Sequence, residues 1–203
     1  MNDKAKTLIS NILYVAAVIL ISFLIVRFVG QRTEVIGSSM VPTLEDGNQL
    51  ITDKITYRFR EPERFDIIVF PHEANEFYIK RIIGMPGETV EIRDDHEIYI
   101  NGELLEEDYG YGVTDPQELA GEKVILGDNE YFVLGDNREV SLDSRYAEVG
   151  NIPRSIIIGR AWIRIFPVKE FGILTGKGGL IHDEKTGTET GNGERADPRD
   201  ALF

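Results

Sequence analysis

An apolar run near the N-terminus sets the first limit on how this chain can fold. Residues 8–29 read LISNILYVAAVILISFLIVRFV, and only Ser10, Asn11, Ser22 and Arg27 interrupt the apolar residues. A helix of about 20 apolar residues crosses the hydrocarbon core of a bilayer, and an arginine near its end can reach the headgroups. We therefore predict a single transmembrane helix over residues 8–29, followed by a folded domain.

A cleaved signal peptide is the alternative interpretation of this run. The run is long for a signal peptide, and residues 27–30 (RFVG) lack the small residues of a cleavage site. Lys4 and Lys6 precede the run, which favours a short cytoplasmic N-terminus over residues 1–7 and an extracytoplasmic domain. Basic residues also flank the other end of the run, so this charge bias is small.

After the run, the pattern predicts a mainly β domain over residues 30–168. Short segments rich in Ile, Val, Phe and Tyr alternate with turn residues, and no stretch has the period of a long amphipathic helix. The Asn101-Gly102 and Asp94-Asp95 pairs predict hairpin turns, the first more strongly. The expected strands are residues 65–70, 76–83, 89–93, 97–100, 103–105, 130–134 and 156–166.

Two segments differ in composition from the rest of the domain. Residues 88–128 are expected to form a small inserted β subregion, and its acidic, Gly-rich part over residues 103–128 is expected to be mobile. Residues 169–203 are rich in Gly, Thr and charged residues. Such a segment cannot bury enough apolar surface to offset its chain entropy, so we predict a disordered tail over 169–203.

The composition also argues against several classes of function. The formal net charge is −13, whereas a protein that binds nucleic-acid phosphates is expected to carry a basic patch. The chain has no cysteine, which excludes thiol nucleophiles, cysteine-bound zinc and disulfides. No HExxH or similar spacing of metal ligands occurs. We therefore expect no nucleic-acid partner, no metal and no cofactor.

A hydroxyl group lies ten residues beyond the apolar run, at Ser39 in the segment GSSMVPTL over residues 37–44. A serine nucleophile needs a base that removes its proton, and histidine is the usual one. His72, His96 and His182 all lie in sequences typical of solvated loops. The pattern therefore does not favour a Ser-His-Asp enzyme.

Lysine can take the place of histidine if its pKa is lowered from about 10.4, and burial among apolar groups lowers it. Lys80 is the best candidate because it lies inside the apolar segment YIKRII, residues 78–83. Strand alternation places Tyr78 and Lys80 on one face and Arg81 on the other, so one of two adjacent cations must point inward. An edge strand with both cations solvated is the alternative that the pattern leaves open.

A polar loop, GDNREVSLDSR over residues 135–145, follows the expected strand at 130–134. By itself it is typical of a turn rich in Asx hydrogen bonds. It could also support a catalytic site, because the Ser141 hydroxyl could orient a neutral lysine and Asp143 could pair with Arg145 and stiffen the loop.

Together these segments resemble the type I signal peptidases, which are membrane-anchored serine proteases with a Ser/Lys dyad. The resemblance extends from the apolar run to about Pro167 and is to the single-span, Gram-positive-like form. One matching box would be weak evidence, but four in the right order at compatible spacings are strong. The boxes are SMVPTL at 39–44, RFDIIVF at 64–70, YIKRIIGMPG at 78–87 and GDNREVSLDSR at 135–145.

The resemblance implies that Ser39 is the nucleophile and Lys80 the general base. It implies that Ser141 orients the lysine, while Asp143 and Arg145 act structurally around the site. The implied substrates are secretory preproteins cut after Ala-x-Ala-like sites at the surface of the cell membrane, with no cofactor.

The substrate is expected to add as a β-strand beside the segment before Ser39. The expected walls of its shallow apolar pockets are Val35, Ile36, Met40, Leu44, Tyr78 and Ile79. The oxyanion is expected to bind the Ser39 N–H. Some family members add a hydroxyl two residues before the nucleophile, where this chain has Gly37, so a second donor is unassigned. The neighbouring Ser38 does not match the nucleophile position.

Two other classes of protein fit this sequence less well. A self-cleaving Ser/Lys peptidase of the repressor type would be soluble and carry a DNA-binding segment, which the apolar run and the acidity disfavour. An anchored β-rich binding module or an inactive relative is disfavoured because Ser39 and Lys80 occur together in their boxes.

Overall fold

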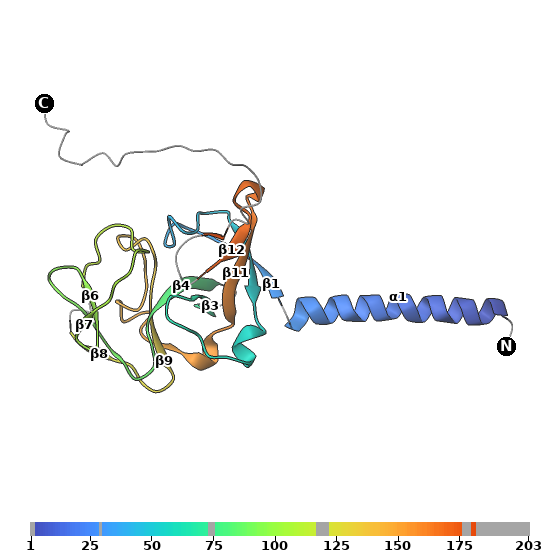
Figure 1. The fold of residues 1–203 in the computed structure, drawn as a ribbon, viewed down its shortest axis with the longest axis horizontal. Helices are drawn as coiled ribbons and strands as arrows, with labels where there is room; N and C mark the ends of the chain where they lie inside the picture. The colour runs from blue at the N-terminus through green and yellow to red at the C-terminus, as the bar shows by residue number, and fades with distance from the viewer. Residues whose placement is uncertain (1–2, 29, 73–75, 117–121, 176–179, 182–203) are drawn as a thin grey trace, which may run out of the picture.

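The computed structural model describes residues 3–28, 30–72, 76–116, 122–175 and 180–181. It consists of one N-terminal helix, α1 (Asp3–Phe28), that projects from a body of β-strands (Figure 1). The mainly β fold that the sequence predicts is thus confirmed. Across the described residues, no helix combines the length and the apolar character needed to cross a membrane. The transmembrane helix predicted over residues 8–29 is therefore not confirmed.

A large antiparallel sheet forms most of the body. Along this sheet, in spatial order, the described strands are β1 (Gly30–Glu34), β2 (Gln49–Asp53), β11 (Gly159–Phe166), β3 (Ile67–Pro71), β4 (Phe77–Gly84), β9 (Glu130–Leu134) and β10 (Ile152–Pro153). β12 (Gly172–Leu174) pairs with β11, and β13 (Leu180–Ile181) pairs with β12. Short 3₁₀ helices lie between strands: η1 (Thr56–Arg58), η2 (Arg154–Ile156) and η3 (Val168–Glu170).

A second, smaller sheet lies within the segment 88–128, on the side of the body away from α1 (Figure 1). Its described strands, in spatial order, are β7 (Glu103–Leu104), β6 (Ile98–Ile100), β5 (Thr89–Ile92) and β8 (Val124–Ile125). The β6–β7 hairpin turns at Asn101 and Gly102, whose φ angles of 53° and 87° are the positive values that an Asn-Gly hairpin turn needs.

Strand β4 is central, and this position decides the environment of the site. It pairs with β3 on one side and with β9 on the other, so it is not an edge strand. Apolar clusters cover both faces of this part of the sheet: Ile79 belongs to one cluster and Ile82 to another. The alternative in which both cations of β4 are solvated is therefore wrong, because Lys80 and Arg81 are 3% and 1% exposed.

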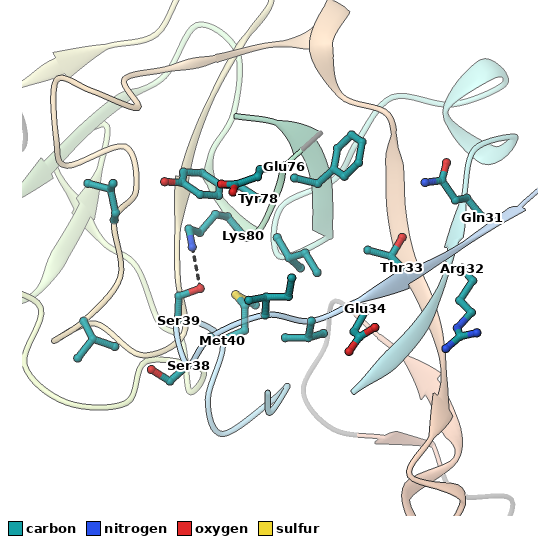
Figure 2. A pocket seen from close by; sticks show the side chains of 17 residues that line it. Gln31, Arg32, Thr33, Glu34, Ser38, Ser39, Met40, Glu76, Tyr78 and Lys80 are labelled. Atoms are coloured by element: carbon teal, nitrogen blue, oxygen red, sulfur yellow. Dashed lines mark hydrogen bonds between the residues drawn. The ribbon is translucent and has the colours of Figure 1, made fainter. Parts of the chain in front are cut away.

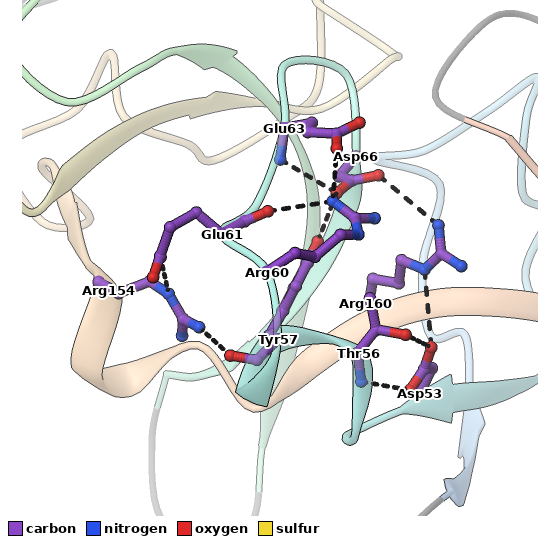
Figure 3. Close-up of polar contacts among 9 residues, drawn as sticks. All are labelled: Asp53, Thr56, Tyr57, Arg60, Glu61, Glu63, Asp66, Arg154 and Arg160. Atoms are coloured by element: carbon purple, nitrogen blue, oxygen red, sulfur yellow. Dashed lines mark hydrogen bonds and ion pairs between the residues drawn. The ribbon is translucent and has the colours of Figure 1, made fainter.

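A polar network joins η1 to the large sheet (Figure 3). The Asp66 carboxylate accepts hydrogen bonds from the Tyr57 hydroxyl at 2.9 Å and from Arg60 Nη1 at 3.2 Å. The Asp53 carboxylate accepts the backbone N–H groups of Ile55 and Thr56 at 2.9 and 3.0 Å, which fixes the start of η1. The aspartate of the 64–70 box thus has structural partners, away from Ser39.

The remaining differences from the predicted elements have simple causes. The segment expected as a strand from residue 156 begins with η2, and its strand starts at Gly159. β1 reads GQRTE and has no apolar alternation, so its sequence gave no strand signal. The disordered tail predicted over 169–203 is wrong at residues 172–174, because β12 pairs with β11 and buries Leu174. Residues 176–179 and 182–203 lie outside the described part of the chain, as do residues 117–121 of the segment expected to be mobile.

Candidate active site

Ser39 and Lys80 meet although they are 41 residues apart in the sequence. Lys80 Nζ donates a hydrogen bond to Ser39 Oγ at 2.8 Å (Figure 2). Ser39 lies in the turn after β1, and Lys80 lies in the middle of β4. The buried side chains of Met40 and Leu44 anchor this turn, and the Asn137 N–H donates to the Ser39 carbonyl at 3.0 Å. Core packing and the hydrogen bond from Asn137 therefore fix the Ser39 turn next to β4.

Burial changes the ease with which Lys80 loses its proton. Removal from water lowers the pKa of Lys80 to about 8, because a desolvated ammonium is disfavoured. The negative charges of Asp143 and Asp136 oppose this effect on the pKa, and the positive charge of Arg145 adds to it. The hydrogen-bond partner of Lys80 is a neutral hydroxyl and not a carboxylate, so the effect of burial on its pKa prevails. An unprotonated amine is thus accessible near neutral pH.

Asp143 and Arg145 form the pair that the sequence predicts. Arg145 Nε and Nη2 donate to the two Asp143 oxygens at 2.8 and 3.0 Å, and both side chains are buried. Asp143 also accepts the Gly135 N–H at 3.1 Å, and Arg145 Nη2 donates to the carbonyl of Arg138 at 2.8 Å. The hydrogen bonds of this pair thus connect the beginning and the end of the loop over residues 135–145.

Ser141 lies in the same loop but does not make the expected contact. Its side chain is buried, and its Oγ has no hydrogen-bond partner among the described residues. Orientation of Lys80 by this hydroxyl is therefore not confirmed. Ser141 packs against Gly135, where an added Cβ would collide with Ser141 Oγ and lie 2.5 Å from the Ser39 carbonyl oxygen. The absence of a side chain at Gly135 thus lets the loop approach Ser39.

The sequence did not identify the partners of Arg81. Its guanidinium donates to Asp136 from Nε at 2.8 Å and from Nη2 at 2.5 Å, and it reaches Thr43 Oγ1 at 3.3 Å. The centroid of the Tyr109 ring, which belongs to the insertion, lies 3.9 Å from Arg81 Cζ. Arg81 therefore connects β4, the Ser39 turn and the insertion. The sequence contained one signal for this contact, because a buried arginine needs a carboxylate partner and the 135–145 box contains Asp136.

A cavity of about 510 Å³ opens beside Ser39 and Lys80 (Figure 2). Of the six predicted wall residues, five line it: Val35, Ile36, Met40, Tyr78 and Ile79. The assignment of Leu44 to the wall is wrong. Its side chain is fully buried in the core, because its N–H bonds the Met40 carbonyl at 2.8 Å and turns the segment inward. The sequence missed Val140 and Leu142, which line the cavity from the 135–145 loop.

The backbone N–H groups of Gly37 and Ser39 differ in whether they have an acceptor. Gly37 has φ of 86°, and its N–H donates to Asp46 Oδ1 at 2.7 Å, so that N–H is already engaged. Within the described residues, no acceptor binds the Ser39 N–H. This group is thus available to a substrate, while a second donor stays unassigned. Ser38 is exposed at the cavity rim.

The two described histidines have partners other than Ser39. His72 stacks on Tyr78 with ring centroids 4.0 Å apart, and His96 Nδ1 lies 3.1 Å from Asp115 Oδ1. His182 lies outside the described residues. In the described part of the chain, no group of three or more His, Asp or Glu side chains is placed to hold a metal ion.

A comparison with protein families finds one family that covers most of the chain. The family model described as "Signal peptidase, peptidase S26" matches residues 8–166. The chain belongs to the signal peptidase family. It is therefore a member of a family of proteases, and the resemblance drawn from the four boxes is confirmed.

Several signal peptidases resemble the chain over most of its length. The probable signal peptidase I-2 of Synechocystis sp. is 42% identical over 155 residues, which cover 73% of this chain and 68% of that protein. The signal peptidase I of Leptolyngbya laminosa is 45% identical over 156 residues, which cover 72% and 74%. A crystal structure of a signal peptidase I from Enterococcus faecalis V583 is 38% identical and covers 50% of this chain and 97% of its own, with a TM-score of 0.40.

Proposed function

We propose that this chain is a serine endopeptidase that removes signal peptides from secretory preproteins, with Ser39 as nucleophile and Lys80 as general base. The 2.8 Å hydrogen bond between Lys80 Nζ and Ser39 Oγ carries the proposal. Membership in the signal peptidase family supplies the substrate class.

The proposed reaction moves one proton between these two groups. Neutral Lys80 accepts the Ser39 hydroxyl proton while Oγ attacks the scissile carbonyl carbon, and the Ser39 N–H donates to the developing oxyanion. The Lys80 ammonium then donates its proton to the leaving amine, which breaks the peptide bond and leaves an ester on Ser39. Neutral Lys80 next removes a proton from water, whose oxygen attacks the ester carbonyl carbon. The Lys80 ammonium then returns that proton to Ser39 Oγ as the ester bond breaks, which releases the signal peptide and restores the pair.

The surroundings of the cavity support cleavage after small residues, as in Ala-x-Ala sites. Among the described strands, β1 lies at one edge of the large sheet and pairs only with β2. Its unpaired edge can therefore accept a substrate strand. Alternate side chains of such a strand would point into the cavity beside Ser39. Apolar walls from Val35, Met40 and Ile79 suit small apolar side chains there.

We also propose that α1 attaches the chain to a lipid bilayer, with its N-terminus in the cytoplasm and the β body on the extracytoplasmic side. Large apolar side chains along α1 are exposed: Leu13 and Ile19 are each 64% exposed and Phe23 is 60% exposed. Membrane fractionation tests this, with the full chain and a chain lacking residues 1–29 compared. Equal recovery of both chains in the soluble fraction would contradict the attachment.

Cleavage of an Ala-x-Ala preprotein by the purified full chain tests the proposed activity. Ser39→Ala and Lys80→Met should each abolish cleavage, since each removes one end of the proton transfer. Ser38→Ala is the matched control, because it deletes the neighbouring exposed hydroxyl and should leave the rate unchanged. Retained cleavage in either of the first two variants would refute the assignment of the pair.

A further inference from the structure

His72 is not the solvated loop residue that the sequence predicts. It directly follows β3, and its N–H donates to the Glu76 carbonyl at 3.1 Å. Its side chain is only 19% exposed, because the imidazole stacks on the Tyr78 ring with centroids 4.0 Å apart and planes at 14°. The stack joins the ends of β3 and β4, next to the cavity.

The Tyr78 ring also faces Lys80. Lys80 Nζ lies 5.0 Å from the Tyr78 ring centroid, within the range of a cation–π contact. The two side chains share a face of β4 because they are two residues apart. On β3, Phe70 is the cross-strand partner of Tyr78, and its ring meets Tyr78 edge-on at 5.9 Å. Phe70 and His72 therefore hold the Tyr78 ring from two directions.

This arrangement matters when the proton moves. The proposed acylation step places a positive charge on Lys80, whose side chain is almost closed to water. The negative face of an aromatic ring stabilises such a charge, but only while the ring stays over the cation. We propose that His72 is a positioning residue for the Ser39–Lys80 pair, acting through Tyr78 by holding that ring against Lys80. This inference rests on the proposed function.

The described charged groups near the stack are Lys80, Glu76 and Glu148. Lys80 lies on the same face of β4 as Tyr78, and Glu76 directly precedes β4 and lines the cavity with both. Glu148 Oε1 approaches His72 Nε2 at 3.9 Å from the far side, and its carboxylate is 64% exposed. A flat ring at position 72 is enough for stacking, so the role needs neither charge nor hydrogen bonding from the imidazole. Phenylalanine should therefore replace His72, and alanine should not.

Two measurements on the full chain in detergent test this role. The first is preprotein cleavage at pH values well above 8, where Lys80 is neutral. His72→Ala should lower kcat about three- to tenfold with KM changed less than about twofold, whereas His72→Phe should match wild type. The second is the titration of Lys80 followed by NMR of isotopically labelled lysine. His72→Ala should lower the Lys80 pKa, because the ammonium loses its ring contact, and His72→Phe should not.

His96→Ala is the control, because it removes an exposed histidine from the distant insertion and should change neither reading. An unchanged kcat and an unchanged Lys80 titration in His72→Ala would overturn the inference. So would a His72→Phe variant as impaired as His72→Ala, since stacking would then not be the cause. A wild-type chain that cleaves no preprotein would refute the proposed function instead, while a lowered Lys80 pKa in His72→Ala would still uphold the effect of the stack on Lys80.

Discussion

Arg81 and Asp136 form a two-point ion pair in which the arginine is 1% exposed and the aspartate 0%. Lys80, the preceding residue, is almost as buried but has a neutral hydroxyl as its partner. Strand β4 thus places two adjacent cations in opposite surroundings. Its arginine is fully paired, whereas its lysine has a pKa lowered to about 8.

Breaking the Arg81–Asp136 pair should destabilise the fold. Asp136→Ala leaves a buried guanidinium without its counter-charge, which costs about 3–5 kcal/mol in other proteins. Denaturant unfolding should show a loss of that size. Glu91→Ala is the control, because it breaks the more exposed Arg93–Glu91 pair and should change the free energy of unfolding by less than about 1 kcal/mol. Equal losses in the two variants would contradict this prediction.

Cleavage should depend on pH through Lys80. Because only the neutral amine accepts the Ser39 proton, kcat/KM should rise with pH through an apparent pKa near 8. It should fall about tenfold for each pH unit well below that value. Initial rates measured across this range check the prediction, and a flat profile from pH 5 to 9 would argue against a lysine base.

Lys80 should also affect stability, with a sign opposite to that of a paired cation. Its pKa is about 8 in the fold and 10.5 in the reference state, so the unfolded chain binds more protons between these values. Stability should therefore rise with pH across this window, by about 3 kcal/mol in total. Lys80→Met should abolish cleavage yet be more stable than wild type at pH 7, with the difference shrinking toward pH 10. Thermal unfolding at several pH values measures this, and a Met variant less stable than wild type at pH 7 would contradict it.

Leu44 lies in the core and Ile36 lies on the cavity wall, so substitutions at these two positions should have different effects. Leu44→Ala should cost about 2–5 kcal/mol of stability, because it empties a fully buried site, while the variant's preference among preprotein sites should not change. Ile36→Ala should do the reverse. Ile36 is 87% exposed on the cavity wall, so its loss should affect KM and site preference with little change in unfolding. A shift in site preference in Leu44→Ala would return that residue to the wall.

Local sequence patterns predicted the centre of the structure well. The apolar segment around Lys80 indicated a buried strand, and Asn101-Gly102 indicated a hairpin, because both signals are encoded within a few neighbouring residues. Ser39 and Lys80 were paired through the chemical need of a serine for a base and through resemblance. Their hydrogen bond then appeared in the structure.

Features that depend on tertiary contacts were not predicted. β1 has no apolar alternation and pairs only because β2 lies beside it. Leu44 appeared to be a wall residue because its distance from Ser39 in sequence is short, but the turn directs it into the core. The contact between His72 and Tyr78 depends on how the β3–β4 hairpin closes, which a histidine beside a proline does not reveal.

The close approach of Gly135 to the Ser39 carbonyl predicts how this protein loses activity. The loop over residues 135–145 bonds the Ser39 carbonyl through the Asn137 N–H, and Gly135 lies against that same carbonyl. A local opening of this loop would therefore free the serine and let water reach the lysine in one event, well before global unfolding. Ser144 lies in the same loop, and its N–H donates to the Val133 carbonyl at 3.1 Å. Hydrogen exchange should show the Gly135, Asn137 and Ser144 amides opening together. The inactive form of this protein would then be a partly opened native state, which temperature could populate long before the sheet melts.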